Sequence, residues 1–299
     1  MGKRDTVWHD FLQDNGRYAD IINAFGLEGE QVVTANDIIE ADSKARTRLR
    51  DEVRKVVFGV SFAVIGIENQ DKIDYSMVER IMRYESIRYD EDRKRICAYN
   101  KRNSNGLNGG EYMYKFQKTD KLHPVITFVI YCGKEPWDAA TSIKGLVNTT
   151  EIPEKLLGFM SDYKINVVDV RHNPDVINKL KTDVRDVLEI IRCSEDKDSL
   201  NRLLSGQNRL IVLNEVAYNL AQEYANLMDA DIEPDEKGEY NMCKAWEDMR
   251  TDSINEGKIE GKILARYEDG MAIDDIAIKT GQTVDFVKDT LKANGVLNV

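Results

Sequence analysis

The sequence predicts an α/β sandwich, in which a mixed central sheet is flanked by helices and followed by an all-helical C-terminal region. Two apolar runs predict the sheet, residues 60–67 and residues 125–131, because uninterrupted β-branched and aromatic residues are typical of buried strands. The third observation is the change after residue 178, where apolar residues recur at helical spacing and no further ladder of strands is evident.

The N-terminal elements of the predicted sandwich are a helix and a pair of strands. Residues 6–25 carry a partly regular apolar face and are predicted to form one helix. Residues 51–58 alternate sufficiently to indicate a strand, and Gly59 marks the turn into a second strand over residues 60–70. Because Gly59 joins them directly, the two strands are expected to be antiparallel, with their far ends side by side.

One helix and two strands complete the predicted core. Residues 75–99 form the helix, since their apolar positions recur at helical spacing and give one side that can cover the sheet. Residues 125–131 form a central strand that is buried on both faces. Residues 163–170 alternate in part and are expected to add a further strand.

The C-terminal region is predicted to be helical, with a loop or linker over residues 232–239. In the tail, two short helices within residues 273–288 are joined through residues 280–282 and resemble a helix-turn-helix. Asp285 and Asp289 stand where a helix that reads the major groove would carry basic or amide side chains. We therefore expect a packing or oligomerisation unit here, and DNA docking is the alternative.

Length and composition set the domain organisation. The 299 residues suffice for one sizeable core and a smaller module, which we place as a core domain over residues 1–195, a helical extension over 196–250 and a helical tail over 251–299. No apolar run of about twenty residues and no secretory leader is evident, so a cytoplasmic protein without membrane contact is expected. The dispersed cysteines and histidines argue against a disulfide framework or a structural zinc site.

The formal net charge of −11 excludes a protein whose whole surface attracts nucleic acid. Binding of DNA would need a local patch of basic and aromatic side chains. The candidates for such a patch are Arg80, Arg83, Tyr84, Arg93, Lys94, Arg95, Lys101 and Arg102. The alternative interpretation is a solvated helix face, because acidic residues at positions 90–92 interrupt the series.

Polar side chains end the predicted strand over residues 60–70. Glu68 and Gln70 are two residues apart and therefore project from one face. Asp51, at the far end of the preceding strand, is expected to lie beside Glu68. Two such carboxylates can hold Mg²⁺ or Mn²⁺, which polarises a phosphate and lowers the pKa of a bound water. An edge strand with solvated polar ends is the alternative.

The arrangement of Asp51 followed by Glu68-x-Gln70 resembles the PD-(D/E)XK nuclease superfamily. More specifically, the chain is similar to the recombination-promoting nuclease and putative transposase family of bacteria, over roughly its first two-thirds. The segments that carry this resemblance, in the family's order, are Arg17-Tyr18-Ala19-Asp20, Gly29-Glu30-Gln31-Val32-Val33, Arg50-Asp51, Gly66-Ile67-Glu68-Asn69-Gln70, Pro124-Val125-Ile126-Thr127 and Glu135-Pro136-Trp137-Asp138.

The resemblance implies a restriction-endonuclease-like fold and a Mg²⁺-dependent deoxyribonuclease, a DNA endonuclease linked to recombination or mobile elements. It implies that Asp51 and Glu68 bind the metal, with the backbone carbonyl of Asn69 as a further ligand, and that Gln70 positions the attacking water. The superfamily usually has Lys where this chain has Gln70, and the family that the chain resembles shares this departure. A neutral amide can orient a water but carries no charge, which predicts slow chemistry.

Two further acidic residues are implied as helpers, and two other functions stay open. The first helix of the superfamily often lends an acidic side chain to the site, which makes Asp20 and Glu30 candidates, although both are expected to be surface charges. The chain could instead be a weakly active or inactive nuclease-fold protein that binds nucleic acid, or an oligomeric regulatory or assembly protein. The expected partners are DNA and a second copy of the chain, joined through the C-terminal helices.

Overall fold

The computed structural model describes residues 3–40, 52–59, 61–103, 107–205, 209–225 and 233–297. The chain divides into two compact units. The first comprises Met1–Leu203 and Leu213–Leu227, and the second comprises Leu204–Val212 and Met228–Val299. Among the described residues, no helix combines the length and the apolar composition that a bilayer span requires.

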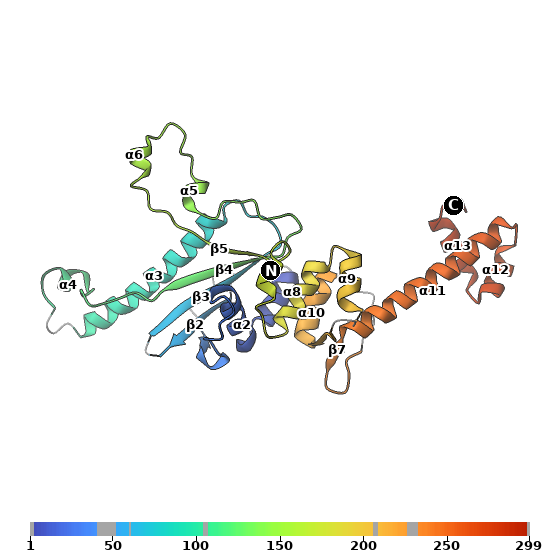
Figure 1. Ribbon diagram of the computed structural model, residues 1–299, viewed down its shortest axis with the longest axis horizontal. Coiled ribbons are helices and arrows are strands. Elements are labelled where there is room, and N and C mark those ends of the chain that lie inside the picture. The colour runs from blue at the N-terminus through green and yellow to red at the C-terminus, as the bar shows by residue number, and fades with distance from the viewer. Residues whose placement is uncertain are drawn as a thin grey trace. The chain divides into compact units, whose positions relative to one another are not determined.

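A mixed five-stranded sheet, in the order β1-β2-β3-β4-β5, lies at the centre of the first unit (Figure 1). The strands are β1 (Ile38–Glu40), β2 (Glu52–Phe58), β3 (Ser61–Gln70), β4 (Val125–Tyr131) and β5 (Asn166–Asp169). The pairings β1–β2 and β2–β3 are antiparallel, whereas β3–β4 and β4–β5 are parallel. The predicted mixed sheet is thereby confirmed.

The strand predictions hold in most details. Gly59 ends β2 with a φ of 59°, in the left-handed region that favours glycine, and so permits the tight connection to β3. β4 has the predicted bounds, lies between two strands, and buries its last five residues. β5 is shorter than the predicted strand over residues 163–170. Two additional three-residue strands, β6 (Val212–Asn214) and β7 (Glu239–Asn241), correct the expectation that no strand follows residue 178.

Helices cover both faces of the sheet in the first unit. The helices described in this unit are α1 (Lys3–Phe11), α2 (Asn15–Gly26), α3 (Met77–Arg102), α4 (Gly109–Tyr114), α5 (Ile143–Leu146), α6 (Glu154–Leu157), α7 (Pro174–Ile177), α8 (Val184–Cys193), α9 (Lys197–Leu204, which ends at the unit boundary) and α10 (Glu215–Ala225), with a 3₁₀ turn η1 (Ala35–Asp37).

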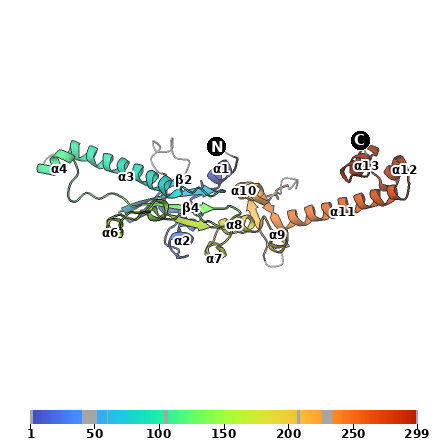
Figure 2. The same ribbon diagram turned by 90° about the horizontal axis from the view of Figure 1, so that it is seen from above.

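Helices α3 and α2 lie on opposite faces of the sheet, as the turned view in Figure 2 shows. Met77, Val78 and Ile81 of α3 are buried in one core with Val129 of β4. On the other face, a Cβ added to Gly26 of α2 would lie 3.0 Å from the ring of Phe128. Since neighbouring residues of a strand point to opposite faces, these contacts establish the sandwich.

The single helix predicted over residues 6–25 is wrong, because α1 and α2 are separate helices. The Asp14 carboxylate accepts a hydrogen bond from the Arg17 backbone N–H at 2.9 Å and so caps the start of α2. An N-cap residue has extended rather than helical backbone, which prevents α1 from continuing into α2.

The helices described in the second unit are α11 (Met242–Glu268), α12 (Ile273–Thr280) and α13 (Val284–Ala293). The two short helices predicted for the tail are α12 and α13, and Gly281 ends α12 with a φ of 69°. They share a core with the C-terminal part of α11, formed by Ile263, Ile276, Ala277, Val287 and Leu291. The tail helices therefore dock onto a helix of the same chain.

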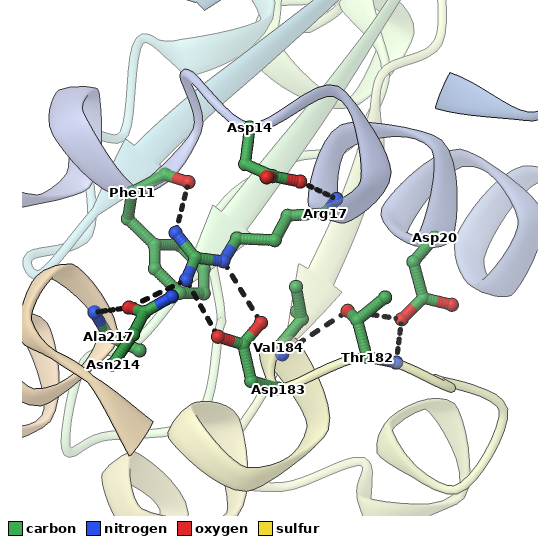
Figure 3. Close-up of polar contacts among 9 residues, drawn as sticks. All are labelled: Phe11, Asp14, Arg17, Asp20, Thr182, Asp183, Val184, Asn214 and Ala217. Carbon is green, nitrogen blue, oxygen red and sulfur yellow. Dashed lines mark hydrogen bonds and ion pairs between the residues drawn. The ribbon is translucent and has the colours of Figure 1, made fainter. Parts of the chain in front are cut away.

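A buried polar network joins α2 to the N-terminal ends of α8 and α10 (Figure 3). The Arg17 guanidinium donates from Nε to Asp183 Oδ1 at 2.9 Å and from Nη2 to Asp183 Oδ2 at 2.7 Å. It also donates to Asn214 Oδ1 at 2.9 Å and to the Phe11 carbonyl at 3.2 Å. Asn214 Oδ1 in turn accepts from the Ala217 N–H at 3.0 Å, in the first turn of α10. Every nitrogen of the buried guanidinium therefore donates a hydrogen bond.

We expect Arg17→Ala to lower the free energy of unfolding by about 3 kcal/mol, because removal of the buried guanidinium leaves the partly buried Asp183 carboxylate uncompensated. Arg17→Lys should recover only part of the loss, since an ammonium cannot donate in a bidentate fork. Urea unfolding followed by circular dichroism measures both effects. Arg93→Ala is the matched control, because its pair with Asp90 is exposed and contributes less than about 1 kcal/mol. A loss in Arg17→Ala no larger than in this control would contradict the assigned role.

Candidate functional site

Glu68 and Gln70 lie near the end of β3, on the sheet face that α3 covers. Glu68 pairs in register with Val129, and Val129 belongs to the core beneath α3. Residues paired across parallel strands share a face, so the side chains of Glu68 and Gln70 point toward α3 and that of Asn69 points to the opposite face. Glu68 is buried, with 5% of its surface exposed. The predicted placement of a carboxylate and an amide on one face is present.

Two side chains converge on one oxygen of the Glu68 carboxylate. Gln70 donates from Nε2 to Glu68 Oε1 at 2.7 Å. The guanidinium of Arg80, from the second turn of α3, forms an ion pair with the same oxygen. Arg80 also pairs with Asp74 Oδ2 at 3.0 Å, just before α3 begins. The helix that covers the sheet thus supplies the positive charge that compensates the buried carboxylate.

The second oxygen, Glu68 Oε2, is buried and accepts no hydrogen bond from any described residue. A buried carboxylate oxygen without a donor is costly, and a carboxylate oxygen is the ligand that Mg²⁺ prefers. Glu68 Oε2 therefore fits a hard cation as one ligand. Asn69 Oδ1 is likewise buried without a hydrogen-bond partner in the described part of the chain, on the other face of the sheet.

A complete ligand set is not present within the described residues. No group of three or more His, Cys, Asp or Glu side chains that could hold a metal occurs there. Asp51, the predicted second ligand, lies outside the described residues. Its neighbour Glu52 begins β2 and pairs in register with Ile67. The fit for a metal therefore depends on Glu68 Oε2, and the contribution of Asp51 stays a prediction.

The two acidic helper residues lie apart from Glu68. Asp20 is buried, not a surface charge as expected. Its carboxylate accepts from the backbone N–H groups of Lys181 and Thr182 and from the Thr182 hydroxyl at 2.7 to 3.0 Å. Figure 3 shows the contacts with Thr182. These bonds hold the turn that precedes α8. Glu30 is exposed. No polar contact among the described residues joins either side chain to Glu68.

Most of the basic side chains proposed for nucleic-acid binding have acidic partners on α3. Arg93 and Lys94 both pair with Asp90, at 2.8 and 2.6 Å, and Arg95 pairs with Asp92. Similarly, Arg83 lies 3.9 Å from Glu79, one turn away. Such pairs at three- and four-residue spacing are typical of a solvated helix face.

Three of the proposed nucleic-acid-binding residues have other surroundings. Tyr84 is partly buried against the core beneath α3, and its ring centroid lies 6.0 Å from the Arg80 guanidinium carbon. Lys101 and Arg102, in the last turn of α3, are exposed and form no ion pair with any described residue. The side chains available to phosphate thus lie at the end of α3 rather than along it.

Glu85 is a partly buried acid that the sequence analysis missed. Its carboxylate interacts with the hydroxyl groups of Tyr163 and Thr127 and with the Thr127 backbone, and burial raises its pKa above the ordinary value. The Tyr163 hydroxyl also has a raised pKa, because it is desolvated and bonds to Glu85. A signal was available, since Glu85 follows Ile81 at a spacing of four and so continues the apolar stripe of α3.

The sheet and its motif indicate the class of protein, and a comparison with known families then identifies the family. A mixed sheet in which Glu68-x-Gln70 ends the strand after a hairpin is the pattern expected for the PD-(D/E)XK class. The family model "Putative transposase, YhgA-like" matches residues 39–223, more than half of the chain. The chain therefore belongs to this family, which confirms the family predicted from its motifs. No curated protein and no solved structure matches the chain.

The raised pKa of Glu85 predicts a pH-dependent stability. A carboxyl whose pKa is higher in the folded state favours the protonated form, so it stabilises the fold below its ordinary pKa and loses this effect as pH rises through the folded-state value. Glu85→Gln cannot ionise, and we expect it to be more stable than wild type at pH 7.5 but not at pH 4.5. Partial exposure screens the charge, so the gain should stay below about 1 kcal/mol.

Urea unfolding of both proteins at the two pH values measures this difference. Glu30→Gln is the control, because Glu30 is exposed. The same difference between Glu85→Gln and wild type at both pH values would show that ionisation of Glu85 does not affect stability.

Proposed function

We propose that the protein is a metal-dependent DNA endonuclease that hydrolyses phosphodiester bonds in recombination or in the movement of mobile elements. The observation that carries this proposal is the buried Glu68 carboxylate, which lies near the end of β3 with one oxygen bonded to Gln70 and Arg80 and the other without a donor among the described residues. Membership of a transposase-related family supports DNA as the substrate.

The proposed metal is Mg²⁺ or Mn²⁺, held by Glu68 and Asp51 with the backbone carbonyl of Asn69 as a further ligand. When bound, the cation would polarise the scissile phosphate and lower the pKa of a water. Gln70 holds its amide 2.7 Å from the Glu68 carboxylate and can orient the attacking water as a hydrogen-bond donor. Arg80 supplies at the same carboxylate the positive charge that Gln70 lacks, and its second partner Asp74 keeps it in place.

A specific observation favours a second function, that of a nuclease-fold protein that binds nucleic acid without efficient cleavage. The Arg80 guanidinium already compensates the Glu68 charge, so a cation must compete with it for this carboxylate. Cation-dependent nicking of plasmid DNA separates the two functions. Wild-type protein that retains DNA in a salt-dependent manner but does not nick it would establish the second.

We expect Asp51→Ala and Glu68→Ala each to abolish cation-dependent cleavage, because each removes a carboxylate ligand from one hard cation. The assay is the conversion of supercoiled and linear DNA in the presence of Mg²⁺ or Mn²⁺, with a chelator as blank. Glu68→Gln tests charge at nearly constant size and should also be inactive. Glu79→Ala is the control, since Glu79 is an exposed acid in the first turn of α3. Cleavage at the wild-type rate in either alanine variant would refute the site assignment.

Gln70→Ala should reduce the single-turnover rate roughly 10²-fold, the usual effect of removing one positioned donor. Gln70→Lys should keep measurable activity, because an ammonium can also donate to the water. Rates are compared at saturating DNA and metal, so that weakened binding does not contribute. An unaltered rate in Gln70→Ala would show that the amide only holds Glu68 in position.

A further inference from the structure

The far end of α3 carries a surface that the proposed cleavage site does not use. Figures 1 and 2 both show that α3 extends beyond the sheet and that α4 lies at its far end. We call residues 99–103 and 107–121 the arm tip. They comprise the last turn of α3, the helix α4 and the segment that returns toward β4.

The charge of the arm tip is opposite to that of the chain. It contains five basic residues, Lys101, Arg102, Lys115, Lys118 and Lys121, and two acidic residues, Glu111 and Asp120, which gives a net charge of +3. The whole chain has a net charge of −11. None of the five basic side chains forms an ion pair within the described part of the chain, in contrast to those in the middle of α3.

Both acids of the arm tip bond to groups inside it. Asp120 Oδ2 accepts from Asn100 Nδ2 at 2.6 Å and from the Gln117 backbone N–H at 2.7 Å. Glu111 Oε1 accepts from the Lys118 backbone N–H at 2.9 Å. The acids therefore hold the shape of the arm tip, and the basic side chains dominate the charge that it offers to a partner.

Asn100 fixes the returning segment against α3. It is 2% exposed, donates from Nδ2 to the Lys115 carbonyl at 2.9 Å, and accepts from Gln117 Nε2 at 3.2 Å. A buried side-chain amide with partners on both its oxygen and its nitrogen specifies one arrangement of the segments that it joins. Hydrogen bonds within the arm tip therefore hold it in one defined conformation.

Aromatic side chains are exposed on this surface. Tyr99 and Tyr114 are 67% and 71% exposed, and Tyr112 is 58% exposed. The ammonium of Lys115 lies 3.5 Å from the centroid of the Tyr112 ring, which leaves Tyr99 and Tyr114 as the more open rings. Exposed aromatic rings beside lysine and arginine are the combination with which proteins bind single-stranded nucleic acid, since bases stack on the rings and phosphates contact the cations.

We propose that the arm tip binds single-stranded DNA, with bases stacked on Tyr99 and Tyr114 and phosphates contacted by Lys101, Arg102 and Lys118. This proposal rests on the proposed function, because it takes DNA as the substrate. It adds that the DNA bound by the arm tip is single-stranded. In a duplex the bases are stacked on one another, so no base face is free to stack on the tyrosine rings. A protein partner is disfavoured by the lysines, which are depleted at protein interfaces.

The test is fluorescence anisotropy of a labelled oligonucleotide of about 20 nucleotides, long enough for a typical single-strand site. Full-length protein is titrated in the presence of a chelator, so that no metal-dependent cleavage occurs, with a duplex of the same sequence measured in parallel. Replacement of both Tyr99 and Tyr114 by Ala should weaken single-strand binding about 100-fold, or tenfold for each ring. Duplex binding should change little, and replacement of both tyrosines by Phe should retain the affinity.

A second pair of variants tests the phosphate contacts. The double variant Lys101→Ala with Lys118→Ala should weaken binding and reduce the salt dependence of log K by about 0.7 for each lost contact. Arg93→Ala with Lys94→Ala is the matched control, because it removes the same charge from the part of α3 where both side chains pair with Asp90. All substituted side chains of both arm-tip variants are exposed, and thermal unfolding checks that each variant is folded.

Three results would overturn the proposal: single-strand affinity unchanged in the folded tyrosine variant, equal losses for single strand and duplex, or an effect of the control as large as that of the lysine variant. Failure of the nuclease assignment gives a different pattern. If the wild-type protein binds single strands through the arm tip but cleaves no DNA, only the nuclease assignment is refuted. If the protein cleaves DNA but the arm-tip variants bind single strands as wild type does, only the proposed role of the arm tip is refuted.

Discussion

The hydrogen-bonded ion pair between Arg17 and Asp183 is the constraint on which the first unit depends. It joins residues 166 positions apart in the sequence, and through Asn214 it extends to the start of α10. Because Arg17 is buried, displacement of α2 would leave a carboxylate, an amide oxygen and a backbone carbonyl without their donor. The same helix bonds to the sheet through the Tyr18 hydroxyl, which donates to the Ile65 carbonyl at 2.7 Å. The position of β3 is therefore coupled to the polar network.

The same rule of charge compensation distinguishes the structural cluster from the candidate site. At Arg17 every nitrogen has an acceptor, and the Asp20 carboxylate beside it has four short contacts to backbone and hydroxyl donors. At Glu68 both donors converge on one oxygen, and the other is buried without a donor among the described residues. A satisfied cluster stabilises a fold, whereas a buried carboxylate with one oxygen open can serve as a ligand to a cation through that oxygen, in competition with the charge that Arg80 already supplies.

Local patterns in the sequence predicted the strands of the sheet well. They could not predict contacts between residues that are far apart in the sequence. The run at residues 125–131 and the turn at Gly59 are determined by their own side chains and backbone, so their bounds could be predicted. The break at Asp14 had a local signal too, because Asp-Asn-Gly favours a helix start over a continued helix. In contrast, nothing near Asp20 indicates that its partners lie more than 160 residues away, and nothing near Arg80 indicates its pair with Glu68.

Spacing along one helix also explains which basic side chains form no ion pair among the described residues. Arg93 and Lys94 have Asp90 three and four residues before them, and they pair with it. Lys101 and Arg102 have Cys97, Ala98 and Tyr99 at the same distances, so no acid on the helix can reach them. They also stand in the last turn, where the helix dipole favours cations. A basic side chain on α3 can therefore attract a phosphate backbone most strongly where no carboxylate of the same helix lies within reach. On α3 this is the case at its far end.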